Sequence, residues 1–90
     1  MTAWRVEFTA IAERDLKKLD ARVRLQVVER IEWLAEHIET LAPIPLHADF
    51  KGMFKLRAGD WRVAYTFEPS ETLIKIRMID HRDKIYKRRI

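Results

Sequence analysis

Lysine and arginine recur at alternate positions in the second half of this chain, where they can bind phosphate groups. From residue 49 onward the sequence holds 11 Lys and Arg against 6 Asp and Glu, whereas the first 48 residues hold 7 against 8. Alternation along a strand places one residue type on one face of a sheet. A small sheet with this charge is suited to a polyanion, and nucleic acid is the leading ligand. The cations expected on its open face or rim are Lys55, Arg57, Arg62, Lys75 and Arg77.

Three strands must carry these cations. Period-two patterns predict strands over about 53–57, 61–67 and 73–79. The segments 58–60 and 68–71 are rich in turn-forming residues and short enough for hairpins. Strands joined by such short turns must pair antiparallel.

The first half predicts a short strand over about 4–8 and two helices. Thr9 and Asp20 can each cap a helix through a side-chain oxygen. The second helix is the strongest prediction, because its apolar residues recur at a helical period over about 18 residues. Pro43 and Pro45 end it, since neither can donate a backbone hydrogen bond. The stripe comprises Val23, Val27, Ile31, Leu34 and Ile38.

Together these elements predict an α+β fold in the order β-α-α-β-β-β. We expect a twisted antiparallel sheet with the two N-terminal helices packed on one face. Ile79 is expected on the cationic face. The side chains expected to be buried against Leu16, Val27, Ile31 and Leu34 are Trp61, Val63, Tyr65, Phe67, Ile74, Ile76 and Met78.

Length and composition narrow the setting. The 90 residues predict one domain, 1–90, and the 48% hydrophobic and 36% charged composition is typical of a globular protein. The chain has no cysteine, so disulfides and thiolate metal sites are excluded. No segment is predicted to be a signal peptide or a membrane span, and we expect a cytoplasmic protein.

Two segments carry a family resemblance. KLRAGDWRVAY, and IDHRDKIY near the C-terminus, together resemble the RelE branch of the RelE/ParE toxins of bacterial toxin–antitoxin modules. The resemblance implies a toxin that enters the ribosomal A site and cleaves messenger RNA there. It also implies a cognate antitoxin that wraps around the toxin, and contact with operator DNA only through the antitoxin complex.

The resemblance assigns four catalytic residues: Lys55, Arg62, Arg82 and Tyr86. Some family members have a further lysine where this chain has Met53. Lys51, on the same side of the predicted strand, or Arg57 on the other flank can supply that charge. The choice of general base therefore stays open.

RNA cleavage of this kind has clear chemical needs. The RNA supplies its own nucleophile, the 2′-hydroxyl, so no serine, cysteine, metal or cofactor is expected. The site must align the reacting groups, accept a proton, stabilise the phosphorane and protonate the leaving 5′-oxygen. Arg62 and Arg82 are suited to clamping phosphate oxygens. Lys55 and His81 are candidates for proton transfer, and Tyr86 can stack on a base or orient the 2′-hydroxyl.

Each candidate also has an ordinary explanation. The strand cations can be a solvated sheet face, Tyr86 can be a packing residue, and His81 can pair with Asp80 or Asp83. His37 and His47 are expected on the surface. Further cations predicted to contact RNA are Lys75, Arg77, Lys84, Lys87, Arg88 and Arg89.

Leu25 and Trp33 fall outside the main apolar stripe of the second helix. Exposed apolar side chains of this size can anchor a partner, and we expect them to bind the antitoxin. Two other functions stay open: a ParE-type gyrase poison of the same fold, and a nucleic-acid-binding domain without catalysis.

Overall fold

The computed structural model describes residues 3–47 and 50–88. Within these residues, two helices and five strands follow one another, with a short 3₁₀ turn before and after the last strand. The elements are β1 (Arg5–Phe8), α1 (Ala10–Lys18), α2 (Ala21–His37), β2 (Ile44–Pro45), β3 (Phe54–Ala58), β4 (Trp61–Glu68), η1 (Pro69–Glu71), β5 (Leu73–His81) and η2 (Ile85–Lys87).

Both helices begin at the predicted caps. The Thr9 hydroxyl accepts a hydrogen bond from the Ala12 amide at 3.1 Å, and the Asp20 carboxylate accepts one from the Val23 amide at 3.0 Å. Each cap satisfies an amide that the first helical turn leaves unpaired. In the described residues, no helix is long and apolar enough to cross a membrane.

The five strands form one mixed sheet in the order β1-β5-β4-β3-β2. The two predicted hairpins, β3–β4 and β4–β5, are antiparallel as expected. The prediction of a wholly antiparallel sheet is wrong at one edge, because β1 pairs parallel with β5. Only strands joined by a short turn must pair antiparallel, and β1 is separated from the hairpins by two helices. The two-residue strand β2 at the other edge was not predicted.

The face of the sheet toward the helices carries the main core. Val63, Tyr65, Ile74 and Ile76 are buried there, as predicted, while Trp61 and Phe67 are partly buried against it. The apolar residues of α2 that pack against them include Val27, Ile31 and Leu34, all at most 3% exposed. The period of two in the strands and the helical period in α2 therefore predicted the packing of α2 on the sheet correctly.

An irregularity in β5 reverses two assignments. Ala64 pairs with Met78 but Tyr65 pairs with Ile76, so Arg77 is an extra residue in β5. Such a β-bulge shifts the alternation of all side chains beyond it. Met78 consequently lies on the face away from the helices, and Ile79 lies in the helix-side core, the reverse of the prediction.

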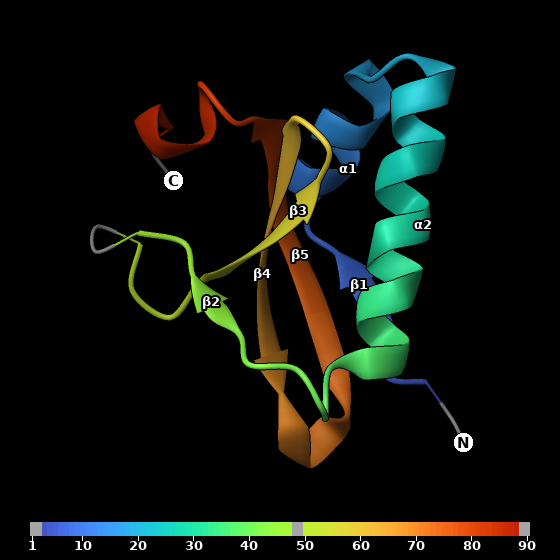
Figure 1. Cartoon of the computed structure of the whole chain (residues 1–90), viewed down its shortest axis with the longest axis vertical. Helices are drawn as coiled ribbons and strands as arrows, with labels where there is room; N and C mark the ends of the chain where they lie inside the picture. Colours follow the sequence, from blue (N-terminus) through green and yellow to red (C-terminus); the bar gives the residue numbers. More distant parts are fainter. Residues whose placement is uncertain (1–2, 48–49, 89–90) are drawn as a thin grey trace.

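The second face is partly covered and not an open cationic surface. Met78 and Ala64 are buried there beneath Leu46 and Ile85, which are 2% and 0% exposed. Figure 1 shows the two helices on one side of the sheet and the C-terminal turn η2 on the other. This turn places its middle residue Tyr86 over the sheet, where the candidate site lies.

Candidate functional site

Three distant segments meet around Tyr86. Lys55 on β3 points its ammonium group at the Tyr86 hydroxyl and donates a hydrogen bond to it at 3.1 Å. The same nitrogen lies 5.6 Å from the centre of the Tyr86 ring. The ring of His47, in the loop between β2 and β3, lies 5.6 Å from the Tyr86 ring. Two of the four predicted catalytic residues are therefore in direct contact.

His47 is the neighbour that the sequence did not assign to the site. It is exposed, as predicted for a surface histidine, but its ring approaches Tyr86. Only the path of the loop brings it there: Leu46 is buried under the sheet, and its amide donates to the Met53 carbonyl at 3.0 Å. No spacing in the sequence could have identified this contact.

The other two predicted catalytic residues flank the β3–β4 turn. The Arg62 guanidinium donates to the carbonyl oxygens of Gly59 and Trp61 at 2.8 and 2.9 Å. Arg82 follows β5, and its amide donates to the Asp60 carbonyl at 2.9 Å. Its exposed guanidinium lies 3.8 Å from the Asp60 carboxylate. The turn thus gathers two arginines at one end of the hairpin.

Arg62 differs from the prediction in its exposure. It was expected on the open face or rim, yet it is only 9% exposed. The reason is local: the side chain folds back to satisfy carbonyl oxygens of the turn, where Gly59 adopts a positive φ of 63°. Arg62 therefore supports the hairpin turn.

Arg57 connects the two groups of residues. It is exposed on β3, directly opposite Arg62 on β4. It lies two residues beyond Lys55, a distance of roughly 7 Å along a strand. Lys55, Arg57 and Arg62 thus occupy successive positions of the β3–β4 pair on the way to the turn and Arg82.

The additional candidates are placed less favourably. Lys51 is exposed and lies in a turn before β3, not on a strand side shared with Lys55. His81 pairs with an aspartate, as its ordinary explanation predicts: its Nδ1 lies 3.4 Å from the Asp83 carboxylate. Its ring also packs edge-on against Trp61, with ring centres 5.4 Å apart.

The C-terminal cations separate into two kinds. Lys84 and Lys87 are exposed. Arg88 is engaged in ion pairs with Asp15 at 2.7 Å and Asp80 at 3.4 Å. Arg89 lies outside the described residues. Arg88, which is predicted to contact RNA, therefore has its guanidinium paired with carboxylates of the protein.

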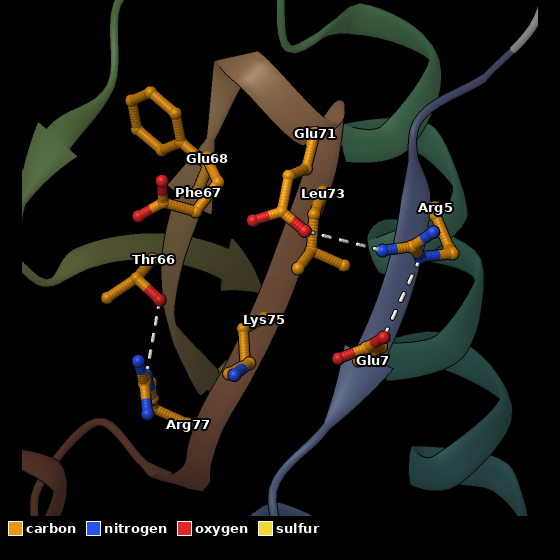
Figure 2. Close-up of a pocket in the computed structure, with 9 residues that line it drawn as sticks. All are labelled: Arg5, Glu7, Thr66, Phe67, Glu68, Glu71, Leu73, Lys75 and Arg77. Atoms are coloured by element: carbon orange, nitrogen blue, oxygen red, sulfur yellow. Dashed lines mark hydrogen bonds and ion pairs between the residues drawn. The ribbon is translucent and has the colours of Figure 1, made fainter.

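Lys75 and Arg77 line a separate polar groove of about 380 Å³. Figure 2 shows this groove on the sheet face opposite α2, with Arg77 donating to the Thr66 hydroxyl at 3.1 Å. Arg5 also lines it, 3.6 Å from Glu7 and 3.9 Å from Glu71. The groove is lined by as many carboxylates as cations, so its charge is more balanced than the strand pattern indicated.

A shallow apolar groove of about 180 Å³ runs between α2 and the β2–β3 edge. Trp33 and Ile44 line it and are 37% and 52% exposed. The Arg30 guanidinium lies 4.3 Å from the centre of the Trp33 ring, and His37 stacks on this ring with centres 4.6 Å apart. Leu25 is 61% exposed but lies outside the lining, about two helical turns before Trp33.

The geometry can support phosphate chemistry at one place. Lys55, Arg57 and Arg82 offer cations to a phosphate, and Tyr86 offers an aromatic face and a hydroxyl beside them. Within 3–47 and 50–88, histidine and carboxylate side chains form no group of three or more that could hold a metal ion.

The chain matches a known family over most of its length. Residues 6–86 match the family described as the ParE toxin of the type II toxin–antitoxin system parDE. Toxin RelG of Mycobacterium tuberculosis (strain ATCC 25618 / H37Rv) is 35% identical over 83 residues, which cover 92% of this chain and 95% of RelG. The chain belongs to the RelE/ParE toxins of type II toxin–antitoxin systems.

Solved structures agree with this assignment. The toxin–antitoxin complex RelBE2 of M. tuberculosis contains a chain 33% identical to this toxin, with a TM-score of 0.79 over 90% of this chain and 93% of that one. The isolated Escherichia coli RelE toxin shares the fold, with a TM-score of 0.71, 18% identity, and coverage of 88% of this chain and 84% of that one. The predicted family and the α+β fold are therefore confirmed.

Proposed function

We propose that this toxin inhibits translation by cleaving messenger RNA in the ribosomal A site, without a metal ion, through attack of the RNA 2′-hydroxyl. The observation that carries the proposal is the contact between Lys55 and Tyr86 at one end of a line of cations. A ParE-type toxin acting on gyrase needs no such pair. The names of the related toxins RelG and RelE point the same way.

Each residue has a defined task in this proposal. The Arg82 guanidinium stabilises the phosphorane, and Arg62 adds charge from beneath it while holding the turn. Tyr86 stacks on a base or orients the 2′-hydroxyl, and Lys55 fixes the Tyr86 hydroxyl and supplies charge. The products are a 2′,3′-cyclic phosphate and a 5′-hydroxyl. Reaction on ribosome-bound messenger RNA takes place in the cytoplasm.

The toxin also binds a cognate antitoxin in this proposal. Relatives of similar fold have been solved as complexes with RelB antitoxins. The groove lined by Trp33 and Ile44 offers exposed apolar side chains beside Arg30 and Arg57. A partly acidic, amphipathic antitoxin segment that folds on binding matches this combination.

Primer extension on messenger RNA after a short pulse of toxin expression tests the enzymatic proposal. We expect new 5′ ends within translated codons, and none when translation initiation is blocked. An Arg82→Ala variant produced at the same level is the matched control. Intact messenger RNA together with gyrase-dependent DNA damage would favour the ParE-type activity, and intact RNA without DNA damage would favour a nonenzymatic binder.

A further inference from the structure

An acidic residue of α1 is bonded to the C-terminal segment. The Asp15 carboxylate accepts a hydrogen bond from the Ile79 amide at 3.0 Å and another from the Arg88 guanidinium at 2.7 Å. Its side chain is only 11% exposed. The contact with Arg88 spans 73 positions of the sequence and closes the chain end onto its first helix.

Arg88 is held from several sides. The nitrogen that meets Asp15 also donates to the Ile79 carbonyl at 3.3 Å and lies 3.4 Å from the Asp80 carboxylate. The Arg88 side chain is 23% exposed. Because charge-assisted hydrogen bonds strengthen where water is partly excluded, this group fixes the residue that immediately follows η2.

The turn η2 needs such external support. Three residues in 3₁₀ conformation have almost no stability of their own. Ile85 anchors the beginning of η2, since it is 0% exposed beneath the sheet. Arg88, the residue directly after η2, is held by its ion pairs with Asp15 and Asp80. Tyr86 lies between these anchors and reaches Lys55.

We infer that Asp15 is a positioning residue for the site: acting through Arg88, it holds η2 so that Tyr86 meets Lys55. The catalytic consequence rests on the proposed function, but the positioning of Tyr86 does not. A carboxylate repels phosphate, so a loss of activity at Asp15 would not come from a lost contact with an RNA phosphate. Asp15 is therefore a cleaner probe than Arg88.

Fluorine NMR can test the positioning in the folded toxin without any RNA. The chain has two tyrosines, so incorporation of 3-fluorotyrosine gives two signals, which a Tyr86→Phe variant assigns. Tyr65 is 1% exposed in the helix-side core and reports whether the fold is intact. In Asp15→Asn we expect the Tyr86 signal to move toward that of free fluorotyrosine while the Tyr65 signal stays in place.

Two further variants make this measurement decisive. Arg88→Gln removes the same contact from the chain end, leaves α1 unaltered, and should move the Tyr86 signal in the same way. Glu71→Gln breaks an exposed ion pair with Arg5 and should move neither signal. An unchanged Tyr86 signal in both Asp15→Asn and Arg88→Gln overturns the inference.

A double-mutant cycle tests the consequence for catalysis. On programmed ribosomes, Asp15→Asn should lower the single-turnover cleavage rate by about 10- to 100-fold, since a small misplacement of a reacting group has effects of this size. In a Tyr86→Ala background the same change should cost less than about threefold, because no side chain remains to be positioned. Equal losses in both backgrounds would overturn the catalytic part. If wild-type toxin cuts no RNA, the proposed function fails while the NMR result still decides the positioning.

Discussion

The Tyr86 hydroxyl accepts a hydrogen bond from the Lys55 ammonium at 3.1 Å, although 31 positions of the sequence separate the two residues. One comes from the first half of strand β3 and the other from a three-residue turn near the chain end. In the proposed function, this contact places an aromatic ring and a charge where one nucleotide can meet both.

The Tyr86 hydroxyl and ring can be separated by two substitutions. Tyr86→Ala should lower ribosome-dependent cleavage by at least about 10²-fold, since both stacking and orientation are lost. Tyr86→Phe keeps the ring but removes the acceptor of the Lys55 hydrogen bond, so its loss should be smaller, about tenfold. Single-turnover rates on programmed ribosomes measure both. Equal rates for the two variants would mean that the ring contributes nothing.

Arg82→Ala should abolish activity without affecting stability. Removal of a preorganised charge from the phosphorane should lower the cleavage rate by at least about 10²-fold. The free energy of unfolding should change by less than about 0.5 kcal/mol, because the Arg82 side chain is exposed and its ion pairs are long. Urea unfolding supplies the second measurement. Arg22→Ala, an exposed arginine on α2, is the control and should leave both quantities unchanged.

Arg62→Ala should impair both activity and folding. The guanidinium is nearly buried and donates to two turn carbonyls, so its removal should lower the free energy of unfolding by about 1–3 kcal/mol. The cleavage rate should fall at least about 10²-fold when it is measured at a temperature where the variant is still folded. A variant as stable as wild type would show that the turn does not depend on Arg62.

Trp33→Ala should weaken antitoxin binding by at least about tenfold, because a large aromatic side chain in an apolar groove typically contributes more than about 1.4 kcal/mol. Ile44→Ser should act in the same direction. Isothermal calorimetry with the antitoxin peptide measures the Kd. Glu29→Gln, an exposed residue of α2 outside the groove, is the matched control. Wild-type affinity in the Trp33 variant would place the antitoxin elsewhere.

Tyr65 should make the toxin sensitive to alkali. Burial raises the pKa of the Tyr65 phenol, so the folded state binds this proton more tightly than the unfolded chain does. Its contribution is complete below the unfolded pKa of about 10 and is lost as the pH rises through the higher folded value. Tyr65→Phe should therefore flatten the fall in unfolding free energy above about pH 10, as measured by urea titrations at several pH values. An identical fall in both proteins would contradict this.

The sequence by itself determined the layers of this protein. Periods of two and 3.6 predicted the α2 core against Val63 and Tyr65, and the caps at Thr9 and Asp20 fixed where the helices begin. These features depend on residues close to one another in the chain, so local patterns suffice to predict them. The two family segments also predict Lys55 and Tyr86 as catalytic residues, and the structure shows that the two side chains are in contact.

Only the tertiary structure decided how the site is assembled. Because Arg77 is an extra residue in β5, Met78 lies on the second face. There it packs in one cluster with Ile85 of the covering turn η2. The contacts of His47 with Tyr86 and of Asp15 with Arg88 join segments far apart in the sequence. Local periodicity carries no record of such contacts, because they depend on the paths of a loop and a chain end across the finished sheet.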